Sequence, residues 1–195
     1  MFLNLNKLSK LAKEAYKLEL IIGDVNGHTI LFSKSWMVSI ENDFVPNTIK
    51  ALIVELTGFL PKSDTIYKIG KSIETPTNVT DTYLNPITHF IKGADIANIK
   101  FTITPIVDDC YTAMRLLQNV NTSQIVTIRE SQYQMIDKGC INYEIEGEPT
   151  GPCSNENTGP MYWYNSIGLV MIAAGKLTNE NLSGALATVD FSEED

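Results

Sequence analysis

The sequence predicts a single α+β domain over residues 1–195, mainly an antiparallel sheet with two β-hairpins, packed with a few short helices. Three observations lead to this fold class. Several short runs alternate apolar and polar residues, which is the period of a half-buried strand. Two pairs of such runs are joined by turn-forming residues. The helical stretches are few and do not alternate regularly with the strands, so a parallel βαβ sheet is not expected.

Length and composition agree with one buried core. The chain has 195 residues, of which 44% are hydrophobic. A chain of this size buries enough apolar surface to be stable as one domain. Only 19% of the residues are charged, and Asn, Thr and Ser take their place. A neutral polar surface of this kind loses little when it is buried against another protein.

The first forty residues predict a helix followed by a hairpin. Leucines at helical spacing predict a helix over residues 3–15. The apolar period changes to two from Tyr16, so a strand is expected from Tyr16 to the turn at 24–27. Asn26 and Gly27 suit a type I′ turn, because both central residues of that turn need a positive φ. We therefore expect 28–32 to pair back as the second strand, and 35–40 to form a further strand.

The next segment predicts one helix and little else that is regular. Apolar residues at helical spacing predict a helix over 49–60, which Pro61 should end because proline cannot continue the hydrogen-bond ladder. Residues 65–73 alternate weakly and could form a strand. Residues 75–86 carry two prolines and several Asn, Thr and Asp residues, so a loop is expected there.

Alternation returns in the middle of the chain. Residues 99–104 predict a strand, which Pro105 should limit to an edge or to a strand end. Asp108 and Asp109 are suited to cap a helix that runs to Leu117. Residues 124–128 predict a strand. A second hairpin is expected over 132–145, with its turn at 137–139.

The last third holds the longest loop and the densest aromatic cluster. Residues 147–160 predict a protruding loop, because a connection of this length without structure of its own is usually functional or disordered. The apolar run 161–174 is long enough for a buried helix with Trp163 facing inward. Thr178 should cap a short helix within a C-terminal tail over 178–195.

Charge and cysteine content exclude several classes of protein. The net charge is −8 and the arginines are Arg115 and Arg129, so the basic surface that nucleic-acid binding needs is missing. No apolar run reaches the ~20 residues of a membrane span, so no membrane partner is expected. Cys110, Cys140 and Cys153 are odd in number and widely spaced, which suits a reducing compartment. The sequence predicts a soluble protein made in a bacterial cytoplasm.

Fragments of two chemical motifs are present, and each is incomplete. Residues 69–72 read Ile-Gly-Lys-Ser, like the end of a phosphate-binding loop, but Thr65 stands where the first glycine is needed. Cys110 with His89 and one of Asp108 or Asp109 could form a nucleophilic set, since an imidazole can lower the pKa of a thiol. A buried cysteine is the simpler interpretation.

Carboxylates and aromatic residues give three weaker hypotheses. Glu144, Glu146 and Glu148 alternate and could bind a divalent cation together with Asp137, although a solvated strand face is commoner. Glu130 and Glu144 could act as an acid/base pair across a hairpin. The aromatic residues that could line a groove or a contact patch are Trp36, Phe44, Tyr162, Trp163 and Tyr164.

We interpret the chain as a non-enzymatic structural or adaptor subunit of a larger protein assembly. The most concrete form is a tailed-phage virion component of the head–tail connector, ring or tail-tube type. No catalytic residue, metal ligand or cofactor is assigned, and a homo-oligomer or other assembly subunits are the expected partners. Two alternatives stay open: a small hydrolase or transferase that uses the Cys/His or carboxylate groups, and a peptide- or ligand-binding module that uses the aromatic cluster. The predicted contact residues are Thr150, Pro152, Asn155, Asn157, Tyr162 and Tyr164.

Overall fold

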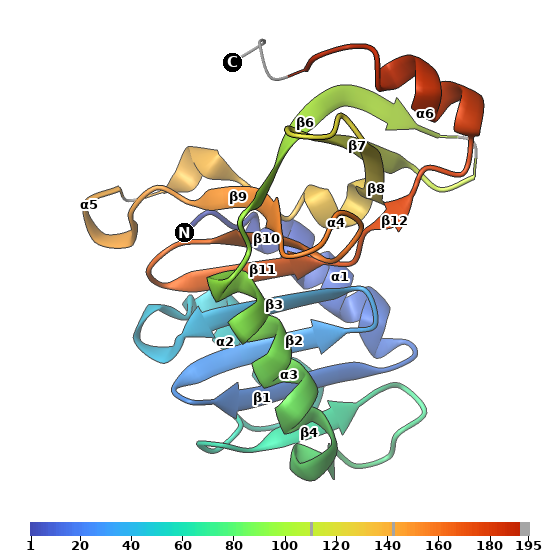
Figure 1. Cartoon of the computed structure of the whole chain (residues 1–195). Coiled ribbons are helices and arrows are strands. Elements are labelled where there is room, and N and C mark those ends of the chain that lie inside the picture. The colour runs from blue at the N-terminus through green and yellow to red at the C-terminus, as the bar shows by residue number, and fades with distance from the viewer. Residues whose placement is uncertain (110, 142, 192–195) are drawn as a thin grey trace.

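A computed structural model describes residues 1–109, 111–141 and 143–191. Its strands join in one twelve-stranded sheet, in the order β12-β8-β7-β6-β9-β10-β11-β3-β2-β1-β4-β5 (Figure 1). Each pairing of neighbouring strands is antiparallel. The prediction of an α+β fold with a mainly antiparallel sheet is therefore confirmed, but the sheet is much larger than two hairpins.

The N-terminal elements follow the sequence closely. They are α1 (Leu5–Tyr16), β1 (Leu20–Val25), β2 (His28–Ser33) and β3 (Trp36–Glu41). The first hairpin is confirmed, since Val25 pairs with His28 and both Asn26 and Gly27 have positive φ. The first strand of this hairpin is also present, but it begins at Leu20 and not at Tyr16. Leu18 and Glu19 both donate their N–H groups to the carbonyl of Ala15, so the helical turn continues to β1.

The next stretch contains one helix that the sequence pattern did not reveal. Its elements are η1 (Asn42–Phe44), α2 (Asn47–Thr57), β4 (Ile66–Ile69), β5 (Thr77–Asn78) and α3 (Thr80–Asp95). The helix over α2 is confirmed, although Gly58 in the left-handed region ends it before Pro61. The loop expected over 75–86 is wrong from Thr80 onward. Helix α3 contains Pro86, and its buried residues Ile87 and Ala94 pack against the sheet, which overrides the local penalty of proline.

The middle of the chain is a strand meander. It comprises β6 (Ile99–Asp108), β7 (Met114–Asn119) and β8 (Ile125–Arg129). Strand β6 runs past Pro105 through an irregularity in its pairing between Ile103 and Val107. The helix expected from Asp108 to Leu117 is wrong. Leu116 and Leu117 are both buried on opposite faces of β7, so the strand shows no alternation that sequence reading could detect.

The second predicted hairpin, over 132–145, is also wrong. The chain there forms α4 (Glu130–Tyr133), η2 (Lys138–Cys140) and α5 (Tyr143–Glu146). Hydrogen bonds to the N-terminal segment hold this stretch: Asn4 donates its N–H to Met135 O at 2.8 Å, and Asp137 donates its own to Phe2 O at 2.9 Å. These bonds replace the cross-strand pairing that a hairpin would have supplied.

The C-terminal part holds four strands and a helix. They are β9 (Thr150–Ser154), β10 (Met161–Tyr164), β11 (Gly168–Ile172), β12 (Gly175–Lys176) and α6 (Glu180–Leu186). The loop expected over 147–160 is interrupted by β9, and the helix expected over 161–174 is wrong because β10 and β11 lie there. The short helix after Thr178 is confirmed, with Asn179 as its cap.

Helices cover both faces of the sheet, and this explains the unbroken apolar runs. Helices α1 and α2 lie on one face, and α3 crosses the other (Figure 1). Along β10, Trp163 packs in the core under α1 and α2, whereas its neighbour Tyr162 packs in the core under α3. A strand that is buried on both faces has the same sequence pattern as a buried helix.

Helix α3 approaches the sheet most closely at Gly93. A Cβ atom at this position would lie 2.5 Å from the hydroxyl oxygen of Tyr162. This is far inside van der Waals contact, and Tyr162 is 1% exposed, so its ring has little room to move. The absence of a side chain at Gly93 thus sets the distance between α3 and β10.

We expect Gly93→Ala to destabilise the protein by about 1–2 kcal/mol, because the overlap outweighs the ~1 kcal/mol of helix propensity that alanine gains. Tyr162→Phe should remove most of this cost in the double variant, because it deletes the overlapping oxygen. Urea unfolding of the natural chain, the two single variants and the double variant measures the coupling.

Gly184→Ala is the matched control, since Gly184 lies in helix α6 with nothing within 4 Å of the added Cβ. This substitution should be neutral or stabilising. An equal cost of Gly93→Ala in the natural chain and in the Tyr162→Phe variant would show that the close approach is not the constraint.

Candidate functional site

The six predicted contact residues do not form one exposed loop. Thr150 and Asn157 are exposed, whereas Asn155 and Tyr164 are half-buried. Pro152 and Tyr162 are buried, so their side chains offer no surface to another chain. A contact role for the remaining four stays a prediction.

Strand β9 explains why the loop interpretation fails. Its Ser154 and Cys153 pair with Ile99 and Lys100 of β6, and on its other side β9 pairs with β10. Gly151 has φ +122°, and a Cβ there would overlap the carbonyl oxygen of Tyr162. The backbone of β9 can lie this close to β10 only because residue 151 is glycine.

The part of this region that does project is the stretch just before β9. We call residues 143–149 the α5 segment. Figure 1 shows α5 beyond the ends of the neighbouring strands, with β9 leading back into the sheet. Tyr143 and Ile145 of this short helix are 60% and 57% exposed. Tyrosine, which combines a large apolar ring with a polar hydroxyl, is enriched at protein interfaces.

The α5 segment is fastened to the body on its inner side. Glu146 is 8% exposed and forms an ion pair with the α-amino group of Met1. Ser166, which precedes β11, donates its hydroxyl to Glu146 O at 2.9 Å. Pro149 is buried. These contacts fix the segment so that its apolar side chains stay exposed.

Sequence reading missed Tyr143 and Ile145 because residues 140–146 resemble a strand. The signal that could have revealed the helix is Gly147, which follows α5 with φ +69°. A glycine in the left-handed region just after a helix is a common way to end it. Glu144 and Glu146 lie on this helix and not on a strand. They therefore do not form the strand face of carboxylates that the sequence predicted as a possible cation site.

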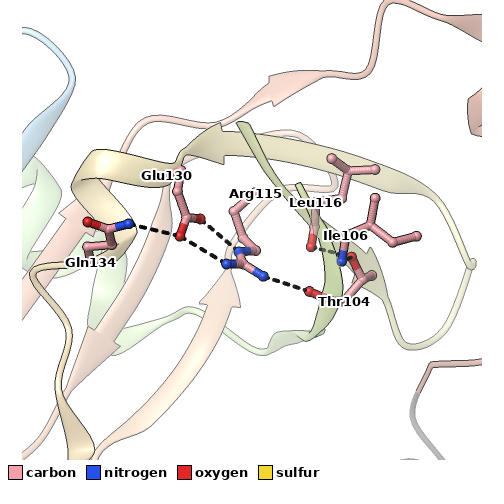
Figure 2. Close-up of polar contacts among 6 residues, drawn as sticks. All are labelled: Thr104, Ile106, Arg115, Leu116, Glu130 and Gln134. Carbon is pink, nitrogen blue, oxygen red and sulfur yellow. Dashed lines mark hydrogen bonds and ion pairs between the residues drawn. The ribbon is translucent and has the colours of Figure 1, made fainter. Parts of the chain in front are cut away.

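Glu130 is held in an ion pair at the start of α4. Figure 2 shows Arg115 of β7 facing Glu130 with two parallel hydrogen bonds, Nε to Oε2 at 2.8 Å and Nη2 to Oε1 at 2.9 Å. Arg115 Nη1 also donates to Thr104 O on β6 at 3.3 Å, and Gln134 Nε2 donates to Glu130 Oε1 at 3.3 Å (Figure 2). The guanidinium carbon lies 5.2 Å from the centre of the Tyr133 ring.

These hydrogen bonds connect β7 to α4 and to β6. The hydrogen bonds from Arg115 lower the pKa of Glu130, and they outweigh the opposing effect of its burial. A carboxyl group with a lowered pKa is ionised at neutral pH and cannot serve as a general acid. The geometry therefore gives Glu130 a structural role, and the acid/base hypothesis for Glu130 and Glu144 gains no support from it.

Two further hypotheses are a Cys110/His89 nucleophilic set and a metal site. Cys110 lies outside the described residues, so the Cys110/His89 set stays a prediction. His89 lies on α3 with its ring centre 6.2 Å from that of Phe90. Within residues 1–109, 111–141 and 143–191, no group of three or more His, Cys, Asp or Glu side chains could hold a metal ion.

The phosphate-loop hypothesis is contradicted by packing at Gly70. A Cβ at this position would lie 2.6 Å from the carbonyl oxygen of Leu18, so the glycine is needed for close approach of two backbone segments. The N–H of Lys71 donates to Tyr16 O at 2.8 Å. A phosphate-binding loop needs such N–H groups pointing at the ligand.

The aromatic residues that could line a groove are mostly internal. Trp36 and Trp163 are buried in the same core, where Trp163 lies 6.3 Å from Tyr133, measured between ring centres. Phe44 is 38% exposed, and Tyr164 is the other aromatic residue of the set that reaches the surface. The set is thus divided between core and surface.

Comparison with protein-family models, curated proteins and solved structures gave no match to this chain. Among the helices of the described residues, none has the length and hydrophobicity needed to cross a membrane.

We expect Glu130→Ala to destabilise the protein by about 2–3 kcal/mol, because it leaves the guanidinium of Arg115 unpaired where the two side chains are only 17% and 14% exposed. Chemical unfolding at pH 7 measures this cost.

The contribution of Glu130 should also depend on pH. A lowered folded-state pKa stabilises the native state above the unfolded-state pKa of about 4.3, and this stabilisation is lost as pH falls through the folded-state value. The stability difference between the natural chain and Glu130→Gln should therefore shrink below about pH 4. A difference that stays constant from pH 7 to pH 3 would contradict the ion-pair account.

Cys153 should be unreactive in the folded protein. Burial raises the pKa of its thiol to about 11, and the side chain is 3% exposed. In a Cys110→Ser/Cys140→Ser background, Ellman's reagent at pH 8 should label Cys153 only after unfolding in guanidinium. Rapid labelling of the native chain would show that β9 opens readily.

Proposed function

We propose that this chain is a non-enzymatic structural or adaptor subunit that joins a larger protein assembly through the α5 segment. The observation that carries the proposal is the exposure of Tyr143 and Ile145 on a segment whose other side is fastened by Glu146. These two contact residues are additional to Thr150, Asn155, Asn157 and Tyr164, whose contact role stays a prediction.

The contacts that hold the α5 segment against the rest of the protein matter, because ordering a flexible segment on binding costs free energy. The bonds from Ser166 and Met1 to Glu146 order α5 before any partner arrives. A pre-ordered segment loses less conformational entropy in the complex. Tyr143 adds a large ring at low entropic cost, which is why tyrosine is common among the residues that dominate interfaces.

The edge strands of the sheet are poorly suited to pair with a strand of another chain, so a contact made by side chains is favoured. The edge strands β5 and β12 are two residues long. Very short edge strands offer few unpaired backbone groups to another chain. An assembly that grows from the α5 segment is compatible with this arrangement.

The most concrete form of the proposal is a tailed-phage virion component of the connector, ring or tail-tube type. Its support is compositional: few charged residues, and a chain rich in Ile, Asn, Lys and Thr. The proposed partner is a second copy of this chain or another subunit of the same assembly.

Tyr143→Ser/Ile145→Ser tests the contact directly. We expect this variant to keep the melting temperature of the natural chain, because both side chains project away from the core. It should sediment as a monomer at concentrations where the natural chain self-associates. Analytical ultracentrifugation over a concentration series measures the association.

Ile96→Ser is the matched control, since Ile96 follows α3 and is 65% exposed. It removes an equally exposed apolar side chain away from α5 and should leave association unchanged. A natural chain that stays monomeric up to millimolar concentration would exclude a second copy as the partner. A double variant that associates as strongly as the natural chain would exclude the α5 segment as the contact.

A further inference from the structure

A cleft of ≈ 220 Å³ opens between the C-terminal end of α3, the start of β2 and the turn between β10 and β11. Apolar residues such as Ile91 and Leu169 form part of its wall, and Ser39, which is 3% exposed, also lines it. The other polar residues of the lining are Asn26, His28, Asp95, Tyr164, Asn165 and Ser166. Apolar walls with a few convergent polar groups are typical of small-molecule sites.

Asn165 presents a hydrogen-bond donor with a fixed orientation. Its Oδ1 accepts the N–H groups of Ile167 at 3.2 Å and Gly168 at 3.0 Å, which together hold the turn. The amide therefore cannot be rotated by 180° without losing both bonds. Its Nδ2 is buried and has no partner among the described residues. A buried donor without a partner costs free energy, which a ligand offering an acceptor would recover.

His28 presents an acceptor in its neutral form. Its Nδ1 lies 3.1 Å from Asn26 O. A carbonyl oxygen can only accept, so Nδ1 carries the proton and Nε2 of the neutral ring keeps its lone pair. Asp95, which is exposed at the rim of the cleft, adds a second acceptor.

Tyr164 can donate across the neutral pH range. Burial raises the pKa of its phenol, with smaller contributions from Cys153 and Asp95. The cleft lining thus combines donors at Tyr164 and Asn165 with acceptors at His28 and Asp95. Among the described residues that line it there is no lysine or arginine, and the carboxylate of Asp95 repels anions.

We propose that this cleft binds a neutral, hydroxyl-rich ligand of the sugar class. A hydroxyl group both donates and accepts a hydrogen bond, so adjacent hydroxyls can satisfy Asn165 Nδ2 and Asp95 together. A phosphate or carboxylate would meet Asp95 without a cation to balance it, and an amine would leave Asn165 Nδ2 without an acceptor. The inference does not depend on the assembly proposed above.

Saturation-transfer NMR with the full-length chain tests this inference, using D-glucose, D-galactose and N-acetyl-D-glucosamine as probes. At least one probe should show transfer from the natural chain. Asn165→Asp keeps an oxygen that can accept the N–H groups of Ile167 and Gly168, but it removes the donor. Binding should weaken by at least about tenfold in this variant, since a hydrogen-bond donor has been replaced by a repelling acceptor.

Asn181→Asp makes the same change on the exposed surface of α6 and should leave binding unchanged. Tyr164→Phe should weaken binding without altering the fold, because it deletes only the hydroxyl. The inference is overturned if no probe shows transfer, or if Asn165→Asp binds as the natural chain does. Inorganic phosphate is the fourth probe, and its binding in place of the sugars would also overturn it.

Discussion

The structure depends on the close approach of β9 to β10 at Gly151. Strand β6 pairs with β9 at Ile99 and Lys100, and it pairs with β7 from Phe101 to Ile103 and again at Val107 and Asp108. Strand β9 is therefore the link between the β6-β7-β8-β12 meander and the strands from β10 to β5. Any side chain at residue 151 would overlap the carbonyl of Tyr162 and separate the two parts. One glycine thus permits a continuous sheet, and hence a continuous core on the face covered by α1.

The position of β9 within the sheet also determines which part of the neighbouring chain is exposed. Because Thr150–Ser154 lies inside the sheet, the chain just before it must turn at the end of the sheet. The α5 segment makes this turn, and Glu146 fastens it to the N-terminal segment. Exposed apolar side chains at a rigid turn are the basis of the proposed contact. The cleft at Asn165 lies next to the same region, since Ser166 binds the carbonyl of Glu146.

Sequence reasoning found the elements whose signals are local. The helical leucines of α1 and the Asn26–Gly27 turn need no distant contact, and both were predicted correctly. It failed where burial on both faces removed the alternation, as in β7 and in β10. It also failed at Pro86, where packing against the sheet stabilises a helix that local propensity disfavours. The candidate site was missed for a related reason: Tyr143 and Ile145 alternate like a strand, and Gly147 after them is the local signal that a helix ends there.

Hydrogen–deuterium exchange at low and high protein concentration tests the central claim most directly, that β9 is internal and the α5 segment is the contact surface. The amides of Cys153 and Ser154 should exchange slowly at both concentrations, because β9 lies between two strands. The amides of residues 143–148 should exchange faster in the dilute protein and slow down as the chain associates. Fast exchange at Cys153 and Ser154, or identical exchange of 143–148 at both concentrations in a chain that does associate, would contradict this account.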